Sequence, residues 1–137
     1  MIDLFSDTHT LPSDGMRRAM AAAEVGDEQR GEDPTTSRLE STVAELLGVG
    51  AAMFMPTGSM CNKVAVAALS RPGDALVCDA LAHVYRFEGG GSAVLTGTVF
   101  EPITTDKGIF TPEQLSAVMN SGSVYQPRTS VVSIEQT

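Results

Sequence analysis

The sequence has little positive charge and no long apolar run, and each shortage excludes a class of protein. Nine Lys and Arg residues stand against seventeen Asp and Glu, which gives a net charge of −8, and the arginines are scattered. Such a surface repels a polyphosphate backbone, so we expect no nucleic-acid partner. No apolar run approaches the roughly 20 residues that cross a bilayer, and the first residues do not have the pattern of a secretory signal. We therefore expect a cytoplasmic protein with no membrane partner.

Cysteine is also scarce. Cys61 and Cys78 are too few and too widely spaced for a disulfide framework or a metal knuckle, which fits a reduced compartment and predicts no metal site. The 137 residues, with 42% hydrophobic and 19% charged side chains, are ordinary for a soluble globular protein. They suffice for a single domain, or for part of one.

Short apolar segments alternate with amphipathic ones, which predicts an α/β fold with a mostly parallel sheet flanked by helices. Residues 51–55 and 75–78 are apolar throughout and are typical of buried strands, with a turn at 71–74 before the second. Residues 93–96 and 130–134 are predicted as the third and fourth strands.

Helix starts are marked by capping residues. Ser13 precedes a short amphipathic helix, and Ser37 with Glu40 has the spacing of a capping box, in a helix that we expect to end at Gly48. Thr111 followed by proline predicts a further helix.

The segment at 56–62, Pro-Thr-Gly-Ser-Met-Cys-Asn, runs from the first predicted strand into a helix that continues to Leu69. The start of a helix leaves backbone N–H groups unpaired, so Gly58 and Ser59 can hold a phosphate with main-chain donors and one hydroxyl. Many strand-to-helix turns carry the same residues only as helix caps. The segment alone leaves both interpretations open.

His83 follows the second predicted strand, and parallel strands present their carboxyl ends at one edge of a sheet. We therefore expect His83 at the same edge as Gly58 and Ser59, where it is either structural or able to stack on a ligand ring and move a proton. Glu88 is expected to face solvent or to pair with Arg86.

Two polar segments have no periodicity. Residues 26–36 contain four acids and are expected to form a solvated loop or an interface. Ser6 belongs to a polar cluster before the first helix, which by itself predicts a cap or a turn. The glycines at 89–91 predict a helix end or close packing.

Five short blocks, in order along the whole chain, match the pattern of one family. They read Met-Ile-Asp-Leu, Ser-Asp-Thr and Thr at 1–4, 6–8 and 10; Val-Gly-Asp and Gly-Glu-Asp-Pro-Thr at 25–27 and 31–35; Pro-Thr-Gly-Ser-Met and Asn at 56–60 and 62; His and Glu at 83 and 88; and Pro-Arg-Thr, Glu and Thr at 127–129, 135 and 137. Together they resemble the low-specificity L-threonine aldolases, pyridoxal-phosphate-dependent lyases of the beta-eliminating lyase family with the aspartate aminotransferase fold.

The resemblance implies that residues 1–137 are the N-terminal portion of the cofactor-binding large domain of a fold-type I enzyme, without the rest of that domain or the C-terminal small domain. It implies cleavage of L-threonine or related L-3-hydroxy amino acids to glycine and an aldehyde. Gly58 and Ser59 would bind the phosphate of pyridoxal 5'-phosphate, His83 would stack on its ring as a catalytic residue, and Ser6 would help hold the substrate carboxylate. Family members are dimers of dimers with shared active sites, so a homodimer or homotetramer is expected, with a possible interface at 26–36.

The chain departs from the family pattern at four positions. Phe5 replaces an arginine, His9 a valine, Gln126 a second histidine and Gln136 an asparagine. Glutamine is no base near neutral pH, so a water or His83 must serve if that second histidine contacts the substrate hydroxyl in relatives. Which 3-hydroxy amino acid is preferred stays open.

The only lysines, Lys63 and Lys107, do not match the family's lysine block, which lies downstream together with the aspartate for the pyridine nitrogen. We therefore expect the chain to be a fragment that is inactive alone. Two alternatives stay open: another amino-acid lyase or racemase of the same fold, or a noncatalytic phosphate-binding module if the gene ends at residue 137.

Overall fold

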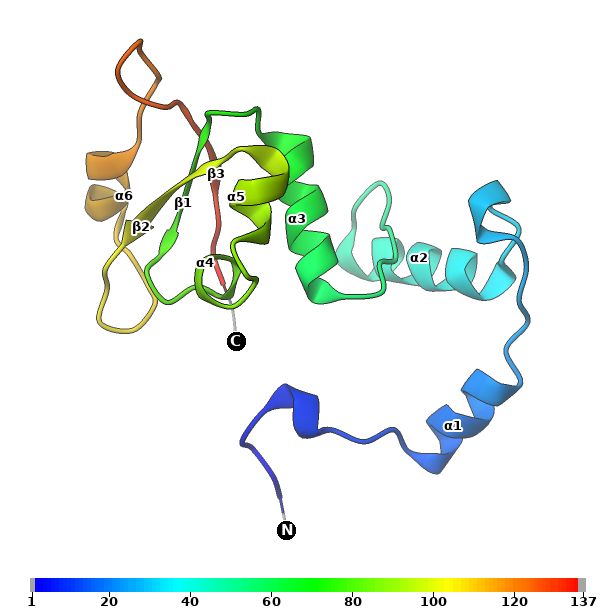
Figure 1. The fold of residues 1–137 in the computed structure, drawn as a ribbon. Helices are drawn as coiled ribbons and strands as arrows, with labels where there is room; N and C mark the ends of the chain where they lie inside the picture. Colours follow the sequence, from blue (N-terminus) through cyan, green and yellow to red (C-terminus); the bar gives the residue numbers. More distant parts are fainter. Residues whose placement is uncertain (1, 136–137) are drawn as a thin grey trace. The chain divides into compact units, whose positions relative to one another are not determined.

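The computed structural model describes residues 2–135, which form two compact units, Met1–Phe54 and Met55–Thr137 (Figure 1). Positions 1, 136 and 137, which belong to the matched blocks or to the departures from them, lie outside the described residues. No helix within 2–135 is long and apolar enough to cross a membrane.

The first unit consists of two 3₁₀ helices, η1 (Asp7–His9) and η2 (Glu28–Arg30), and two α-helices, α1 (Asp14–Ala21) and α2 (Pro34–Leu47). None of its described residues is buried. Its elements are therefore held by local hydrogen bonds rather than by a core. The predicted cap of α1 is confirmed, because the Ser13 hydroxyl accepts a hydrogen bond from the backbone N–H of the third helical residue.

The predicted start of α2 is wrong. The helix begins at Pro34, inside the segment predicted as a loop, and Ser37 lies within it. Asp33 is the cap, with Oδ1 accepting from the Thr36 N–H at 2.8 Å, and proline suits the first helical position because its missing N–H would have no partner there. The predicted end is confirmed at Gly48, whose φ of 65° is the left-handed conformation of a C-cap.

The loop at 26–36 is more ordered than predicted. It contains η2, and Oδ2 of Asp33 accepts from the Gly26 N–H at 3.1 Å. These backbone donors hold the pKa of Asp33 below its usual range, that of Thr36 contributing most. Gly26 has no room for a side chain, since a Cβ there would lie 2.2 Å from the Glu32 carbonyl oxygen.

The second unit contains a three-stranded parallel sheet in the order β2-β1-β3. The strands are β1 (Ala75–Asp79), β2 (Val99–Ile103) and β3 (Thr129–Val132). All five residues of β1 are buried. The predicted parallel sheet is confirmed, and so are the strand at 75–78 and the strand at 130–134, which begins and ends earlier than predicted.

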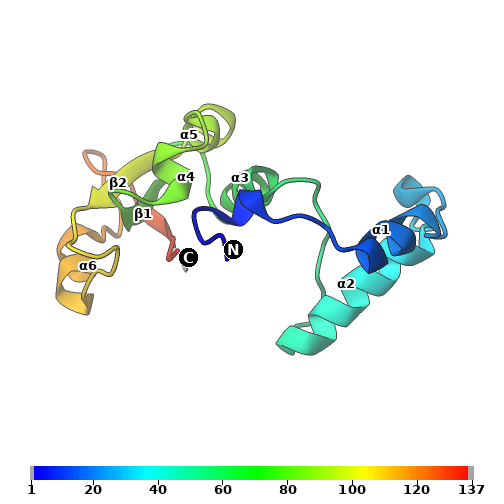
Figure 2. The same ribbon diagram turned by 90° about the horizontal axis from the view of Figure 1, so that it is seen from below.

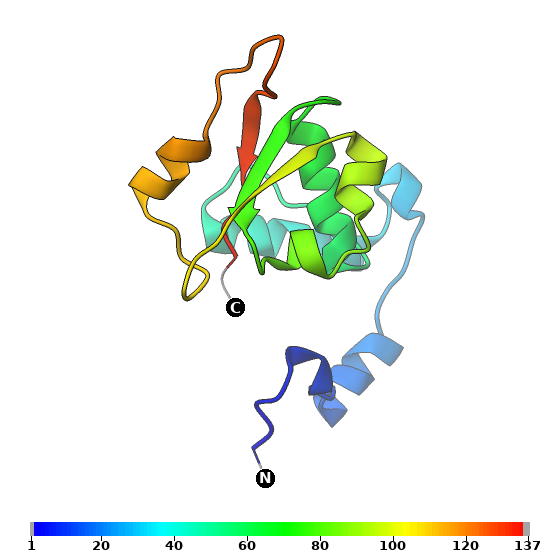
Figure 3. The ribbon, with the colours of Figure 1, turned by 60° about the vertical axis from the view of Figure 1, so that its left-hand side comes forward.

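In the second unit one helix precedes β1 and the others lie between the strands along the chain. They are α3 (Gly58–Leu69), α4 (His83–Arg86), α5 (Gly91–Thr96) and α6 (Pro112–Val118). Figure 2 shows α4 at the end of β1 from which the chain leaves the strand. In Figures 1 and 3, α3 and α5 lie on one side of the sheet and α6 on the other. Right-handed crossovers require this, because the chain passes from β1 to β2 and then back across β1 to β3.

The buried core lies between α3, α4 and β1. It consists of the following side chains: Val66, Leu76, Cys78, Ala82 and Val84. Burial raises the pKa of the Cys78 thiol to about 11, so this cysteine packs as a neutral apolar group and is not a thiolate nucleophile.

Two of the four predicted strands are wrong. Residues 51–55 are irregular, and none of the described strands pairs with them. Residues 93–96 are part of α5, which lies between Gly90 and Gly97, both left-handed with φ of 67° and 68°. A four-residue apolar run does not distinguish a helix turn from a strand. The strand that follows is β2, where Pro102 is tolerated because the strand is an edge of the described sheet.

An ion pair connects the start of β1 to the start of β3. Asp74 Oδ2 lies 2.7 Å from Arg128 Nη2 and also accepts from the Arg71 N–H at 2.9 Å. The Arg128 side chain, followed by the Arg71 N–H, holds the pKa of Asp74 below its usual range. Asp74 therefore stabilises the fold when ionised.

Replacing this carboxylate should destabilise the protein only above acidic pH. A folded-state pKa below the unfolded value adds stability that is present above the unfolded pKa and is lost as pH falls through the folded pKa. For Asp74→Asn in the full-length protein we expect a lower unfolding midpoint at about pH 7 and a difference from wild type that shrinks toward about pH 3. Urea unfolding across this range, with Asp106→Asn as the control, measures it. A deficit that does not change with pH would contradict the assignment.

Candidate functional site

At the start of α3, one residue caps the helix, and the next two residues carry hydrogen-bond donors without a partner in the helix. Thr57 is the N-cap: its hydroxyl accepts from the Met60 N–H at 3.1 Å, and its carbonyl accepts from the Met60 and Cys61 N–H groups. The N–H groups of Gly58 and Ser59 occupy the first two helical positions, which have no partner inside a helix. The Ser59 hydroxyl has no hydrogen bond to any of the described residues. The Thr57 cap therefore leaves the Gly58 and Ser59 N–H groups and the Ser59 hydroxyl without a partner among the described residues.

The space in front of Gly58 is open. A Cβ built on this glycine would meet nothing within 4 Å. Two backbone N–H groups and one hydroxyl thus lie at the positive end of a 12-residue helix, next to the open space in front of Gly58. This arrangement suits a phosphate group.

His83 begins α4, directly after β1 and its turn, as predicted. Its backbone N–H donates to Glu135 Oε2 at 2.5 Å. Its side chain is 52% exposed and lies against the Phe87 ring, with 5.8 Å between ring centroids. The ring of His83 is therefore open to a ligand on part of its surface.

Glu88 connects His83 to the helix that carries Gly58 and Ser59. Its side chain is 0% exposed, and Oε1 accepts from Asn62 Nδ2 at 2.6 Å and lies 3.1 Å from His83 Nδ1. Asn62 is one turn further along α3 than Gly58. The prediction that Glu88 faces solvent or pairs with Arg86 is wrong. The chain turns back at Gly89 and Gly90, both with positive φ, after a four-residue helix, and this carries Glu88 inward.

The structure thus brings three of the four predicted site residues into one unit, with α3 beginning at the edge of the sheet where β1 ends (Figure 1). The fourth, Ser6, belongs to the other unit. There its hydroxyl caps η1 by accepting from the Thr8 N–H at 3.3 Å. Its role toward a substrate stays a prediction.

Two departures from the family pattern contact each other beside Ser6. The rings of Phe5 and His9 are stacked with 5.0 Å between centroids. His9 Nδ1 lies 3.1 Å from Asp3 Oδ2, and the pKa of Asp3 is lowered mainly by the Phe5 N–H and then by His9. The two substitutions therefore form one local cluster.

Neither lysine lies free at the helix start. The side chain of Lys63 runs along Gly91, where a Cβ would be 2.2 Å from Lys63 Cε. Lys107 lines a separate cavity of about 310 Å³ together with Asp79 and Glu135. The pKa of Asp79 is lowered, first by the Thr105 hydroxyl and then by the Leu81 N–H.

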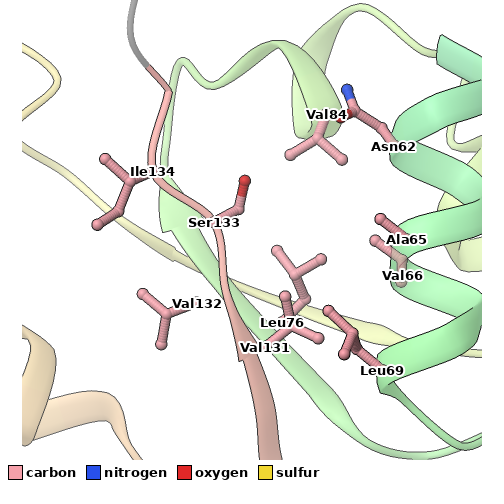
Figure 4. Close-up of a pocket in the computed structure, with 10 residues that line it drawn as sticks. All are labelled: Asn62, Ala65, Val66, Leu69, Leu76, Val84, Val131, Val132, Ser133 and Ile134. Atoms are coloured by element: carbon pink, nitrogen blue, oxygen red, sulfur yellow. The ribbon is translucent and has the colours of Figure 1, made fainter. Parts of the chain in front are cut away.

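A second cavity, of about 230 Å³, lies between α3 and β3 (Figure 4). Its walls are mostly aliphatic, with Asn62 and Ser133 as the polar residues on its lining. Such a surface offers little to a charged ligand. The helix start beside His83 is the better candidate site. Among residues 2–135, no group of three His, Cys, Asp or Glu could hold a metal ion.

Comparison with known sequences finds matches along nearly the whole chain. The profile of the beta-eliminating lyases matches residues 3–137. The low specificity L-threonine aldolase of Escherichia coli strain K12 is 40% identical over 138 residues, covering 100% of this chain and 41% of that protein. That of Saccharomyces cerevisiae is 36% identical, covering 98% of this chain and 36% of the relative. The probable low-specificity L-threonine aldolase 2 of Arabidopsis thaliana is also 36% identical, covering 99% and 39%. The chain spans about two fifths of the length of these relatives.

The cap and the free donors can be separated by mutation. Thr57→Val removes a hydroxyl that holds a helix N–H, so we expect about 1 kcal/mol lower stability. Ser59→Ala removes a hydroxyl without a partner in the described chain, so we expect a change within about 0.5 kcal/mol. Denaturant unfolding of the cofactor-free full-length protein measures both. Equal losses would show that Ser59 is structural.

Proposed function

Because the chain belongs to the beta-eliminating lyase family, we propose that residues 1–137 are the N-terminal portion of the cofactor-binding large domain of a pyridoxal-phosphate-dependent lyase. The complete protein would cleave L-threonine or related L-3-hydroxy amino acids to glycine and an aldehyde, the activity named for its relatives. The observation that supports this most directly is the connection from the start of α3, through Asn62 and Glu88, to His83.

The helix start suits the phosphate of the cofactor. The N–H groups of Gly58 and Ser59 and the Ser59 hydroxyl supply three donors, and the helix dipole favours the phosphate charge. When bound, pyridoxal phosphate supplies an electron sink for the electron pair released as the Cα–Cβ bond breaks.

His83 would lie against the cofactor ring with its exposed surface and hold the ring in place. Its ring nitrogen turned away from Glu88 is the atom that would accept a proton. Ser6 would contribute to binding the substrate carboxylate, with an arginine from outside this chain. The lysine and the aspartate that the cofactor needs would also come from outside it, because neither Lys63 nor Lys107 matches the family's lysine block.

Assembly and location follow from the same proposal. We propose a cytoplasmic homodimer or homotetramer with shared active sites, in which residues 26–36 contribute to the interface between subunits. The ordered state of this loop, with Asp33 holding Gly26, gives it a defined surface for such a contact.

The activity can be tested on the full-length protein with pyridoxal phosphate. We expect visible absorbance from the bound cofactor, and glycine with an aldehyde from L-threonine, L-allo-threonine or phenylserine. Gln126 and Phe5 favour one other candidate, an amino-acid lyase or racemase of the same fold, which product analysis with serine and alanine would reveal. A colourless protein that forms no product would exclude both.

His83 should matter for turnover more than for folding. Its side chain is half exposed, so His83→Ala removes a proton-transfer group without opening a core cavity, and we expect about 100-fold lower kcat. Arg86→Ala, an exposed change in the same helix, is the matched control. Steady-state kinetics and circular dichroism measure the two properties. Unchanged kcat in His83→Ala would remove His83 from the proposed reaction.

A further inference from the structure

We infer that Glu88 is a positioning residue that holds the His83 ring as the tautomer protonated on Nδ1 and leaves the Nε2 lone pair free. This inference rests on the proposed function for its catalytic meaning, but the hydrogen-bond arrangement is a property of the protein alone. It assigns a role to the buried Glu88, whose contacts join Asn62 of α3 to His83 of α4.

The donors and acceptors around Glu88 Oε1 determine the tautomer. Asn62 Nδ2 is a donor only, and at 2.6 Å it uses one lone pair of Oε1. When Glu88 is ionised its carboxylate can only accept, and the contact of 3.1 Å from His83 Nδ1 then requires the proton on Nδ1. Neutral imidazole carries one proton, and Nε2 is then the acceptor.

Burial makes this arrangement the favoured one. The Glu88 side chain is 0% exposed, and its Oε2 has no partner among the described residues. A buried carboxylate is costly unless hydrogen bonds compensate for the lost water. Both donors that reach it act on Oε1, so turning the ring proton to Nε2 would leave the carboxylate with Asn62 alone.

The consequence lies on the opposite side of the ring. With Nδ1–H directed at the buried carboxylate, Nε2 is the nitrogen available to a ligand on the half-exposed part of His83. A proton leaving a substrate hydroxyl would bond to the Nε2 lone pair, and the resulting imidazolium would be balanced by the Glu88 carboxylate. Return of that proton to water or product restores the starting state. Such a carboxylate–histidine pair orients the base and stabilises its charged form.

Ring-nitrogen NMR tests the inference directly. In the cofactor-free full-length protein labelled with ¹⁵N-histidine, and at alkaline pH where histidine rings are neutral, we expect a protonated Nδ1 and an unprotonated Nε2 for His83. His83→Asn identifies the signals by their loss. A proton on Nε2 in the wild type overturns the inference, and this result does not depend on any Glu88 variant folding.

Variants at Glu88 separate positioning from packing. Glu88→Met keeps the length but removes the acceptor, so we expect the pure Nδ1–H tautomer to be lost. Glu88→Gln keeps an amide oxygen, and the Asn62 donor favours that oxygen at the position of Glu88 Oε1. We therefore expect the Nδ1–H tautomer to be retained. Glu135→Gln is the control, because among residues 2–135 Glu135 accepts from the His83 backbone N–H and not from the His83 ring. An unchanged tautomer in Glu88→Met would show that Glu88 is merely structural.

Kinetics then connect the inference to the reaction. We expect Glu88→Met to lower kcat by about 10- to 100-fold, the range known for loss of a hydrogen-bond partner from a functional histidine in metal sites, and Glu88→Gln to lower it less. If the tautomer shifts in Glu88→Met and kcat does not change, the catalytic meaning fails while the hydrogen-bond assignment stands. If no aldol cleavage is found at all, the proposed function fails and the NMR result still decides the inference.

Discussion

The parallel pairing of β1 on both of its edges is the constraint on which the second unit depends. With β2 on one side and β3 on the other, every residue of β1 is buried, and the chain leaves the sheet directly into the turn before His83. The preceding helix packs against the sheet, so that α3 begins at the edge where β1 ends (Figure 1). For this reason Gly58 and His83, which are 25 positions apart in the sequence, lie at the same edge of the sheet.

At the start of α3, structural and functional chemistry belong to different residues. The Thr57 hydroxyl and carbonyl satisfy the later N–H groups, and this leaves the N–H groups of Gly58 and Ser59 free, with open space in front of Gly58. A segment rich in threonine, glycine and serine is therefore neither only a cap nor only a phosphate site. The two roles lie on adjacent residues, which a composition-based interpretation cannot separate.

The helix caps were predicted well from the sequence, and the pairing of strands was predicted poorly. The caps at Ser13, Gly48 and Thr111 are as expected, because the partners of a cap lie within a few residues. Residues 93–96 and 51–55 are not strands, since a strand requires a distant partner that an apolar run does not specify. The start of α2 was predicted wrongly for another reason. Asp33 and Ser37 are both acceptable caps, and Pro34 together with the Gly26 contact favours Asp33.

The sequence by itself determined the family, the α/β class with a parallel sheet, and Gly58, Ser59 and His83 as candidates for one edge of that sheet. Ordered blocks and capping residues are local signals, readable without knowing the fold. Only the tertiary structure decided the place of Glu88, which the sequence left with Arg86 or solvent. Its contacts with Asn62, 26 residues away, and with His83 depend on burial, and burial is created by elements packing together. The tautomer inferred for His83 follows from that burial.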